Sequence, residues 1–303
     1  METTETTETI PSTTAQVVAR CADLVAEQFV LPDTGERAAA LLRSRSAAGA
    51  YDDLDPASLA EALSADLHDV AHDLHLRVIH HPDGVPPTDD PEALEAYWNR
   101  MARSTAGGMR RVERLPGNVA HVVIGPVLTP ATPSWDAVCA AMALVADADA
   151  LVLDVRECRG GDPDTVQLLM SHVVGDEPVR LVDMESRTDG LRQRWTHPVD
   201  PHRFGPDKPL VVLTSGTTFS GGEEVAFDVQ DLARGRVVGE RTRGGANPRE
   251  GFAVHPELEL AVPVARAFSA RTGASWEGVG VAPDVECPAD EALDRALALL
   301  GGA

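Results

Sequence analysis

The stretch Leu210-Val-Val-Leu-Thr-Ser-Gly-Thr-Thr-Phe-Ser-Gly-Gly-Glu-Glu224 decides the fold. Its first four residues are apolar and rich in branched side chains, which is typical of a strand buried on both faces. A short polar turn follows, and Ser220 with Glu223 three residues later forms the S-x-x-E pattern that starts a helix. A buried strand that runs through a turn into a helix is the repeating unit of α/β folds.

The same alternation extends on both sides of this stretch and predicts an α/β core over residues 106–303. The expected strands and helices follow in chain order: strands 119–124, 151–155 and 210–213, and helices 135–146, 165–173, 223–232 and 291–300. Because the strands alternate with helices, we expect them to be parallel and covered on both faces.

The first third of the chain has a different pattern. Apolar residues recur at helical spacing over residues 17–29, 38–42, 59–74 and 94–101, which predicts an N-terminal helical bundle over residues 13–105. Residues 1–12 are a Thr/Glu repeat with nothing to bury, and we expect a disordered tail there.

Composition excludes several classes of protein. The chain of 303 residues carries 26 Lys+Arg against 48 Asp+Glu, a formal net charge of -22, so nucleic acid and anionic membranes are not expected partners. The sequence shows neither a signal peptide nor an apolar run of membrane-spanning length, and we expect a cytoplasmic protein. Its four cysteines form no C-x-x-C pair, which favours free thiols over a zinc site or disulfides.

Ser220 has two interpretations, which are compatible. As a helix cap it satisfies free backbone N–H groups, and as a nucleophile it lies where those groups and the helix dipole would stabilise an oxyanion. The glycines that follow it leave the backbone open to a substrate carbonyl.

An active serine needs a base, and the sequence offers a lysine or a histidine. The only lysine, Lys208, precedes the strand and would lie at the opposite end from Ser220. Among ten histidines, His68, His72 and His75 are expected on one helix. His68-Asp-Val-Ala-His72 also imitates the H-E-x-x-H zinc motif, but its acid is one methylene shorter, and we expect no metal.

Two further segments stand out. Asp154-Val-Arg156-Glu-Cys-Arg-Gly160-Gly161 ends a buried strand in a double glycine, which is either a plain turn or a loop that offers N–H groups. Trp276-Glu277 places a carboxylate in a glycine-rich segment expected to be a strand, where an isolated glutamate alone indicates little.

Taken together and in this order, these segments resemble the tail-specific (C-terminal processing) serine peptidase family, in the branch of the interphotoreceptor retinoid-binding protein repeats and the tricorn protease core. The resemblance runs from about residue 13 to the end, and its motifs are 49–51, 66–76, 115–119, 154–161, 218–224, 238–246 and 276–284. The lysine of the tail-specific branch would fall near Gly244 and Gly245, so that branch's Ser/Lys dyad is absent.

The resemblance implies a crotonase-like (Clp protease/crotonase) α/β core packed with a helical bundle. It also implies a Ser/His/Glu site, with Ser220 as nucleophile, His75 as general base and Glu277 orienting the imidazole. The N–H groups of Gly221 and of Gly160 or Gly161 would then form the oxyanion hole.

The expected function is hydrolysis of peptide bonds through an acyl-enzyme, without a cofactor, on a peptide or protein substrate. Two alternatives remain open from the sequence: a non-catalytic protein that binds an apolar ligand, and a serine acyltransferase or peptide cyclase.

Overall fold

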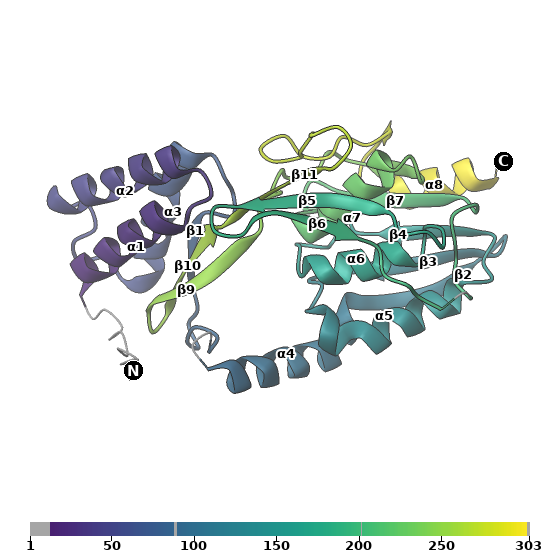
Figure 1. Cartoon of the computed structure of the whole chain (residues 1–303), viewed down its shortest axis with the longest axis horizontal. Coiled ribbons are helices and arrows are strands. Elements are labelled where there is room, and N and C mark those ends of the chain that lie inside the picture. Colours follow the sequence, from purple (N-terminus) through teal and green to yellow (C-terminus); the bar gives the residue numbers. More distant parts are fainter. Residues whose placement is uncertain (1–12, 88–89, 201, 302–303) are drawn as a thin grey trace. The chain divides into compact units, whose positions relative to one another are not determined.

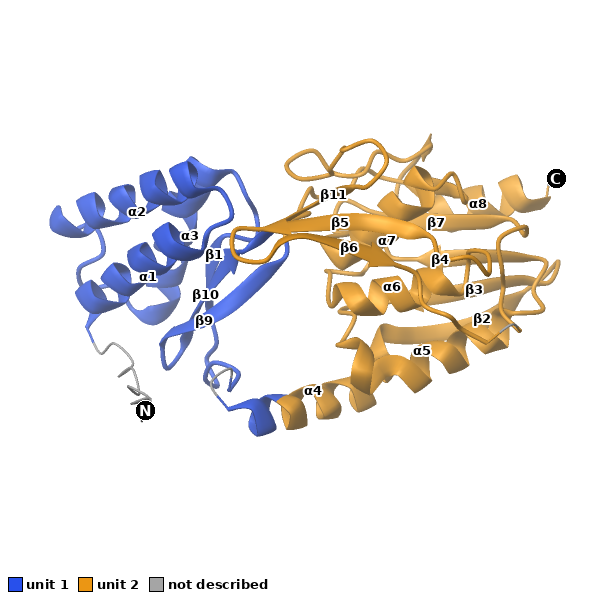
Figure 2. Ribbon diagram, viewed as in Figure 1, with its two compact units in different colours: residues 1–94, 248–265 blue, residues 95–247, 266–303 orange. Residues whose placement is uncertain are grey.

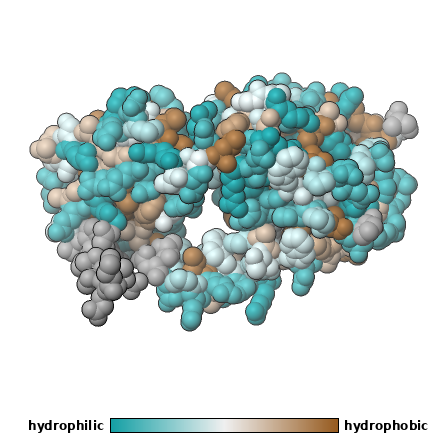
Figure 3. Space-filling model, viewed as in Figure 1, coloured by the Kyte–Doolittle hydropathy of each residue, from teal (hydrophilic) through white to brown (hydrophobic). Residues whose placement is uncertain are grey.

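The computed structural model describes residues 13–87, 90–200 and 202–301, and divides the chain into two compact units (Figures 1 and 2). Unit 1 comprises residues 1–94 and 248–265, and unit 2 comprises residues 95–247 and 266–303. The disordered tail expected over residues 1–12 lies outside the described residues. Polar side chains dominate the visible face of each unit, as expected of a chain in which 24% of the residues are charged (Figure 3).

Unit 1 combines three helices with a small antiparallel sheet in the order β1-β10-β9. Its elements are α1 (Thr14–Gln28), α2 (Pro32–Ala47), α3 (Pro56–Ala71), β1 (Arg77–His80), β9 (Arg249–His255) and β10 (Leu258–Pro263). Alternate residues of the sheet, including Leu258 and Leu260, pack with the apolar faces of the helices in one core.

This arrangement departs from the division expected from the sequence. The hairpin 248–265 returns to unit 1 because β10 pairs with β1, with Arg77 opposite Ala261. Most of α4 (Pro91–Thr105) belongs to unit 2 rather than to the bundle.

Unit 2 is built on a six-stranded sheet in the order β12-β8-β7-β4-β3-β2. All its strands run parallel except β2 at the edge, which pairs antiparallel with β3. The sheet's elements are β2 (Met109–Leu115), β3 (Val119–Ile124), β4 (Ala150–Asp154), β7 (Leu210–Thr214), β8 (Arg236–Gly239) and β12 (Val285–Glu286). A second sheet, in the order β11-β5-β6, consists of β5 (Arg180–Ser186), β6 (Gly190–Trp195) and β11 (Ala265–Ser269).

Helices cover both faces of the parallel sheet, which confirms the expectation of buried strands. Leu151 and Leu153 of β4 face the core that includes helices α5 (Ala131–Val145), α6 (Pro163–Ser171) and α7 (Gly221–Asp231). Val152, between them, faces the core that includes α8 (Ala292–Gly301). Because successive strand residues point to opposite faces, strands covered on both sides are continuous apolar runs.

Candidate active site

The sharp turn between β7 and α7 presents Ser220. Ser220 is the residue before the helix and has φ 52° and ψ −121°, a backbone conformation that is strained for any residue except glycine. Its carbonyl accepts the N–H groups of Glu223 and Glu224, and the carboxylate of Glu223 accepts the Ser220 N–H at 2.8 Å. The helix start expected at Ser220 is therefore confirmed, and the nucleophile candidate is held at its positive end.

The double glycine after β4 packs directly against this turn. A β-carbon on Gly160 would lie 2.8 Å from the Cβ of Ser220 and 3.3 Å from its Oγ. A β-carbon on Gly161 would lie 2.1 Å from the carbonyl oxygen of Leu128. Both glycines have strongly positive φ, 116° and 128°, so no other residue fits either position without strain.

Unengaged backbone donors lie in the two segments that pack beside Ser220. Within the part of the chain that the structure describes, the N–H groups of Gly160, Gly161 and Gly221 donate to no protein acceptor. A β-carbon on Gly221 would lie 3.1 Å from the Gly161 carbonyl oxygen, so the two segments are in contact. Converging N–H groups next to a serine hydroxyl are what a developing oxyanion requires.

Glu277 lies in a turn of unit 2, so the expectation of a strand there is wrong. Its Oε2 accepts the N–H groups of Ala246 at 2.6 Å and Asn247 at 3.0 Å. The neighbouring Trp276 is buried and donates its indole N–H to the carbonyl of Gly245. These bonds attach the turn that carries Glu277 to residues 244–247.

His75 lies in unit 1, after α3 rather than on it. The helix ends at Ala71 because His72 adopts the left-handed conformation, with φ 55°. The prediction that one helix carries His68, His72 and His75 is therefore wrong for the last two. His75 is buried, and its backbone N–H donates to Asp73 Oδ1 at 2.8 Å. Ser220 and Glu277 belong to unit 2.

Lys208 and Ser220 lie beyond opposite ends of β7. Lys208 precedes β7, whereas Ser220 follows that strand's carboxyl end, and its Nζ donates to the carbonyl of Ala146. The four cysteines are free thiols, of which Cys21 and Cys158 are buried. Burial raises the pKa of the Cys158 thiol to about 11, against the lowering effect of the Gly160 backbone, so the thiol is neutral at physiological pH.

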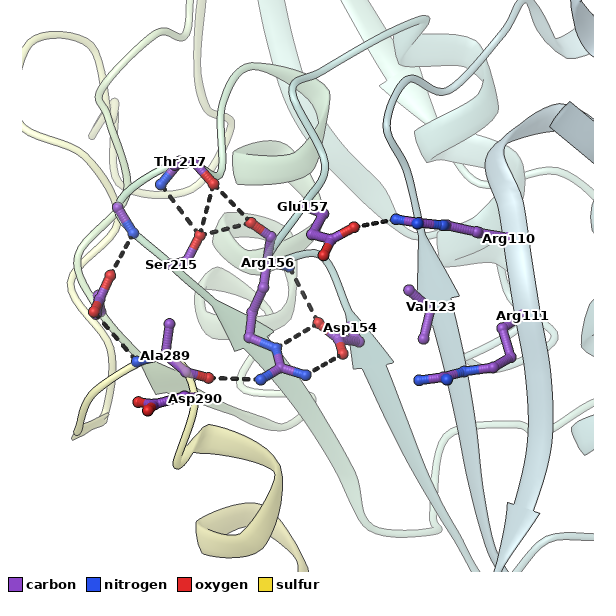
Figure 4. A pocket seen from close by; sticks show the side chains of 12 residues that line it. Arg110, Arg111, Val123, Asp154, Arg156, Glu157, Ser215, Thr217, Ala289 and Asp290 are labelled. Atoms are coloured by element: carbon purple, nitrogen blue, oxygen red, sulfur yellow. Dashed lines mark hydrogen bonds and ion pairs between the residues drawn. The ribbon is translucent and has the colours of Figure 1, made fainter.

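A pocket of about 650 Å³ opens at the carboxyl ends of the parallel strands of unit 2 (Figure 4). Arg156 binds Asp154 through both carboxylate oxygens, and the pair lines the pocket. Burial alone would raise the pKa of Asp154, but hydrogen bonds from Arg156 and His121 hold that pKa below its ordinary value. Asp154, Arg156, Glu157 and residues 215–217 line the pocket and belong to the segments that lead to Gly160 and Ser220, but Ser220 does not line it.

Sequence reasoning missed two elements of this site. The first is the role of the 244–247 segment: its residues 244–246 lie in the motif 238–246, but the binding of Glu277 by the N–H groups of Ala246 and Asn247 was not expected. The second is Glu223, which appeared as a helix cap alone but also accepts donors from residues 242–245. Both depend on contacts between residues distant in the sequence.

Comparisons with known proteins identify the family of the chain. The pattern of peptidase family S41 matches residues 128–287, and the pattern of the N-terminal domain of peptidase S41 in eukaryotic IRBP matches residues 1–106. The chloroplastic C-terminal processing peptidase of Tetradesmus obliquus is 31% identical over 137 residues, which cover 45% of this chain and 28% of that protein. This chain thus spans much less than the length of that relative.

Solved structures share the fold. The photosystem II D1 C-terminal processing protease covers 96% of this chain and 98% of its own, with a TM-score of 0.55 and 18% identity. The tricorn protease covers 95% of this chain and 36% of its own, with a TM-score of 0.62 and 12% identity. The core of unit 2 is therefore of the crotonase-like α/β class, as expected. Since the first family pattern spans more than half of the chain, this protein belongs to peptidase family S41.

Proposed function

We propose that this protein is a serine-type peptidase that hydrolyses peptide bonds through an acyl-enzyme formed on Ser220. The observation that carries the proposal is the strained Ser220 at the start of α7, packed against Gly160 with the N–H groups of Gly161 and Gly221 beside it. Membership of a peptidase family supports a peptide or protein as the substrate.

In this mechanism His75 removes the proton of the Ser220 hydroxyl as Oγ attacks the carbonyl carbon of the scissile bond. The negative charge on the carbonyl oxygen is stabilised by the N–H group of Gly221 and by that of Gly160 or Gly161. His75 then gives the proton to the departing amine, and Glu277 stabilises the imidazolium. Water, deprotonated by His75, then attacks the acyl-enzyme; the acid product leaves as the ester bond to Ser220 Oγ breaks, and His75 returns the proton to Oγ.

A mixture of peptides of varied sequence tests this function directly. The wild-type protein is expected to cleave a subset of them, which mass spectrometry identifies as paired fragments, and Ser220→Ala is expected to cleave none. The exposed serine of α4 gives a matched control, Ser104→Ala, which retains the cleavage pattern. Products ligated or cyclised rather than hydrolysed would assign the chain to acyl transfer instead.

We also propose a cytoplasmic location. The four free thiols support it, because a reducing compartment preserves them. None of the described helices has the length and apolar character to cross a membrane. Fractionation of cells that express the protein with its native termini tests the location, and recovery outside the cytoplasm would contradict it.

A further inference from the structure

Glu223 is a completely buried carboxylate that accepts four hydrogen bonds. Its Oε2 accepts the N–H groups of Ser220 at 2.8 Å and Gly245 at 2.9 Å. Its Oε1 accepts the hydroxyl of Thr242 at 2.5 Å and the N–H of Gly244 at 2.7 Å. Each oxygen thus has two donors, which is more than a helix cap needs.

The donor pattern favours the ionised form of Glu223. Burial raises the pKa of this carboxyl above its ordinary value, and the hydrogen bonds from Thr242, Gly245, Gly244 and Ser220 offset part of that effect. The Thr242 hydroxyl accepts the N–H of Val281 at 2.7 Å and donates its own proton to Glu223. The other three partners of Glu223 are backbone N–H groups, which can only donate, and protonation of Glu223 would take the charged acceptor from all four partners.

The bond to Ser220 acts on the strained part of the backbone. A residue with positive φ outside glycine persists only where its surroundings fix it. Glu223 holds the N–H of Ser220, and the Ser220 carbonyl accepts two N–H groups of the first turn of α7. The nucleophile is therefore fixed on both sides of its Cα, and Glu223 supplies the only side chain among these contacts.

The same carboxylate also fixes the segment that binds Glu277. Gly244 and Gly245 donate to Glu223, and the next two residues, Ala246 and Asn247, donate to Glu277. Four consecutive N–H groups are thereby divided between two carboxylates. A displacement of Glu223 would move the Ser220 backbone and the support of Glu277 together.

We propose that Glu223 is a positioning residue for catalysis, which sets the Ser220 backbone and the 242–247 segment in the geometry that acylation needs. This inference rests on the proposed peptidase function. Glu223 touches neither substrate nor reacting atoms, and it acts through Ser220 and through the backbone that supports Glu277.

Glu223→Gln is the informative variant, because it keeps the shape and removes acceptor capacity. The amide oxygen of the glutamine accepts two of the four donors. Its NH2 group faces the other two donors and cannot accept from them, so two hydrogen bonds are lost. Glu259→Gln, in unit 1, is the matched control: Glu259 is also a buried carboxylate and accepts from Arg249 and His81. Thr242→Val is a milder second variant, which removes one donor and leaves the three backbone donors.

The readout is the rate of Ser220 modification by a fluorophosphonate over a range of concentrations, with thermal unfolding measured in parallel. Glu223→Gln is expected to lower the maximal inactivation rate on the order of 100-fold, as misplacement of a reacting group does, with KI close to the wild-type value. The pH midpoint of inactivation stays unchanged, because the base is intact. Thr242→Val lowers the rate in the same direction and less, while Glu259→Gln lowers the unfolding temperature without lowering the rate.

The outcomes separate this inference from the proposed function. A wild-type protein that is not modified overturns both. A wild-type protein that is modified at Ser220, with Glu223→Gln modified equally fast, overturns the positioning role alone. If Glu223→Gln does not fold, an unchanged rate in Thr242→Val overturns the role.

Discussion

A β-carbon on Gly160 would lie 2.8 Å from the Cβ of Ser220, closer than two such carbons approach in proteins. Residues 60 positions apart thus pack so tightly that one must be glycine. The double glycine after β4 is therefore a component of the Ser220 site rather than a plain turn.

Gly160→Ala is expected to lower the rate of Ser220 acylation on the order of 100-fold, the effect of losing one oxyanion donor. The added methyl group must displace either the serine or the loop that carries Gly161. Acylation rates by intact-mass spectrometry measure this. Gly117→Ala is the control, because Gly117 also has positive φ, 78°, but has no neighbour within 4 Å. Equal losses in both variants would show that backbone strain alone is responsible.

Glu277→Gln is expected to keep the fold and lower the turnover of a peptide substrate. The amide oxygen can still accept the N–H groups of Ala246 and Asn247, but the charge that stabilises an imidazolium is lost. Steady-state kinetics are expected to show a lower kcat with KM nearly unchanged. Glu286→Gln changes an exposed carboxylate of β12 and serves as control. A wild-type kcat for Glu277→Gln would exclude the orienting role.

Stability is expected to fall as the pH rises from about 5 to about 7, because of Glu224. This buried side chain lies one turn before buried Asp228 on α7, and both lie near Arg194 of β6. Burial raises the pKa of Glu224 to about 7, against the lowering effect of Arg194. Burial and the Glu224 charge raise the pKa of Asp228 too. The charged groups that act on the pair are Arg194, Asp162, Asp164 and Asp231.

The sign follows from proton binding. The folded state keeps a proton on Glu224 that the unfolded chain releases at a lower pH, so stability is lost as the pH rises through the folded pKa. Glu224→Gln is expected to flatten this slope and to raise the unfolding temperature at pH 8. Urea unfolding at pH 5, 6, 7 and 8 measures the slope of the free energy of unfolding against pH, and thermal unfolding at pH 8 measures the unfolding temperature. A slope that persists in Glu224→Gln would assign the pH dependence to other groups.

Asp154→Asn is expected to destabilise unit 2 by about 1.5–3 kcal/mol, the usual contribution of hydrogen bonds to a charged group, because the partly exposed Arg156 loses its charged acceptor. Arg156 would lose its bidentate partner, and His121 would lose a charged acceptor. Because the pKa of Asp154 is lowered in the fold, its contribution is present at neutral pH and is lost as the pH falls below the ordinary Asp range. Asp154→Asn combined with Arg156→Met completes a double-mutant cycle, and additive effects would contradict the pairing.

The local elements of the fold were predictable from the sequence because burial on both faces leaves a clear pattern. Val212 and its neighbours form such an apolar run, and the helix start at Ser220 is marked by its own capping residues. The end of α3 was not predictable. Val70 and Leu74 keep helical spacing, but the left-handed His72 terminates the helix before His75.

The rest of the site depends on pairings between distant residues, which no local pattern encodes. The return of 248–265 to unit 1 is set by pairing of β10 with β1, residues that are far apart in the chain. The turn at Glu277 is likewise set by the backbone of residues 244–247. Resemblance to a family indicated the residue types of the site. The four hydrogen bonds that Glu223 accepts became visible only in the structure.

The central claim is that Ser220 is an activated nucleophile with His75 as its base. Intact-mass spectrometry after incubation with a fluorophosphonate tests it on the wild type, Ser220→Ala and His75→Ala, with the exposed His202→Ala as control. We predict one adduct on the wild type and on His202→Ala, and none on Ser220→Ala or His75→Ala. A folded wild-type protein without an adduct, or an adduct that forms as fast without His75, would contradict the account.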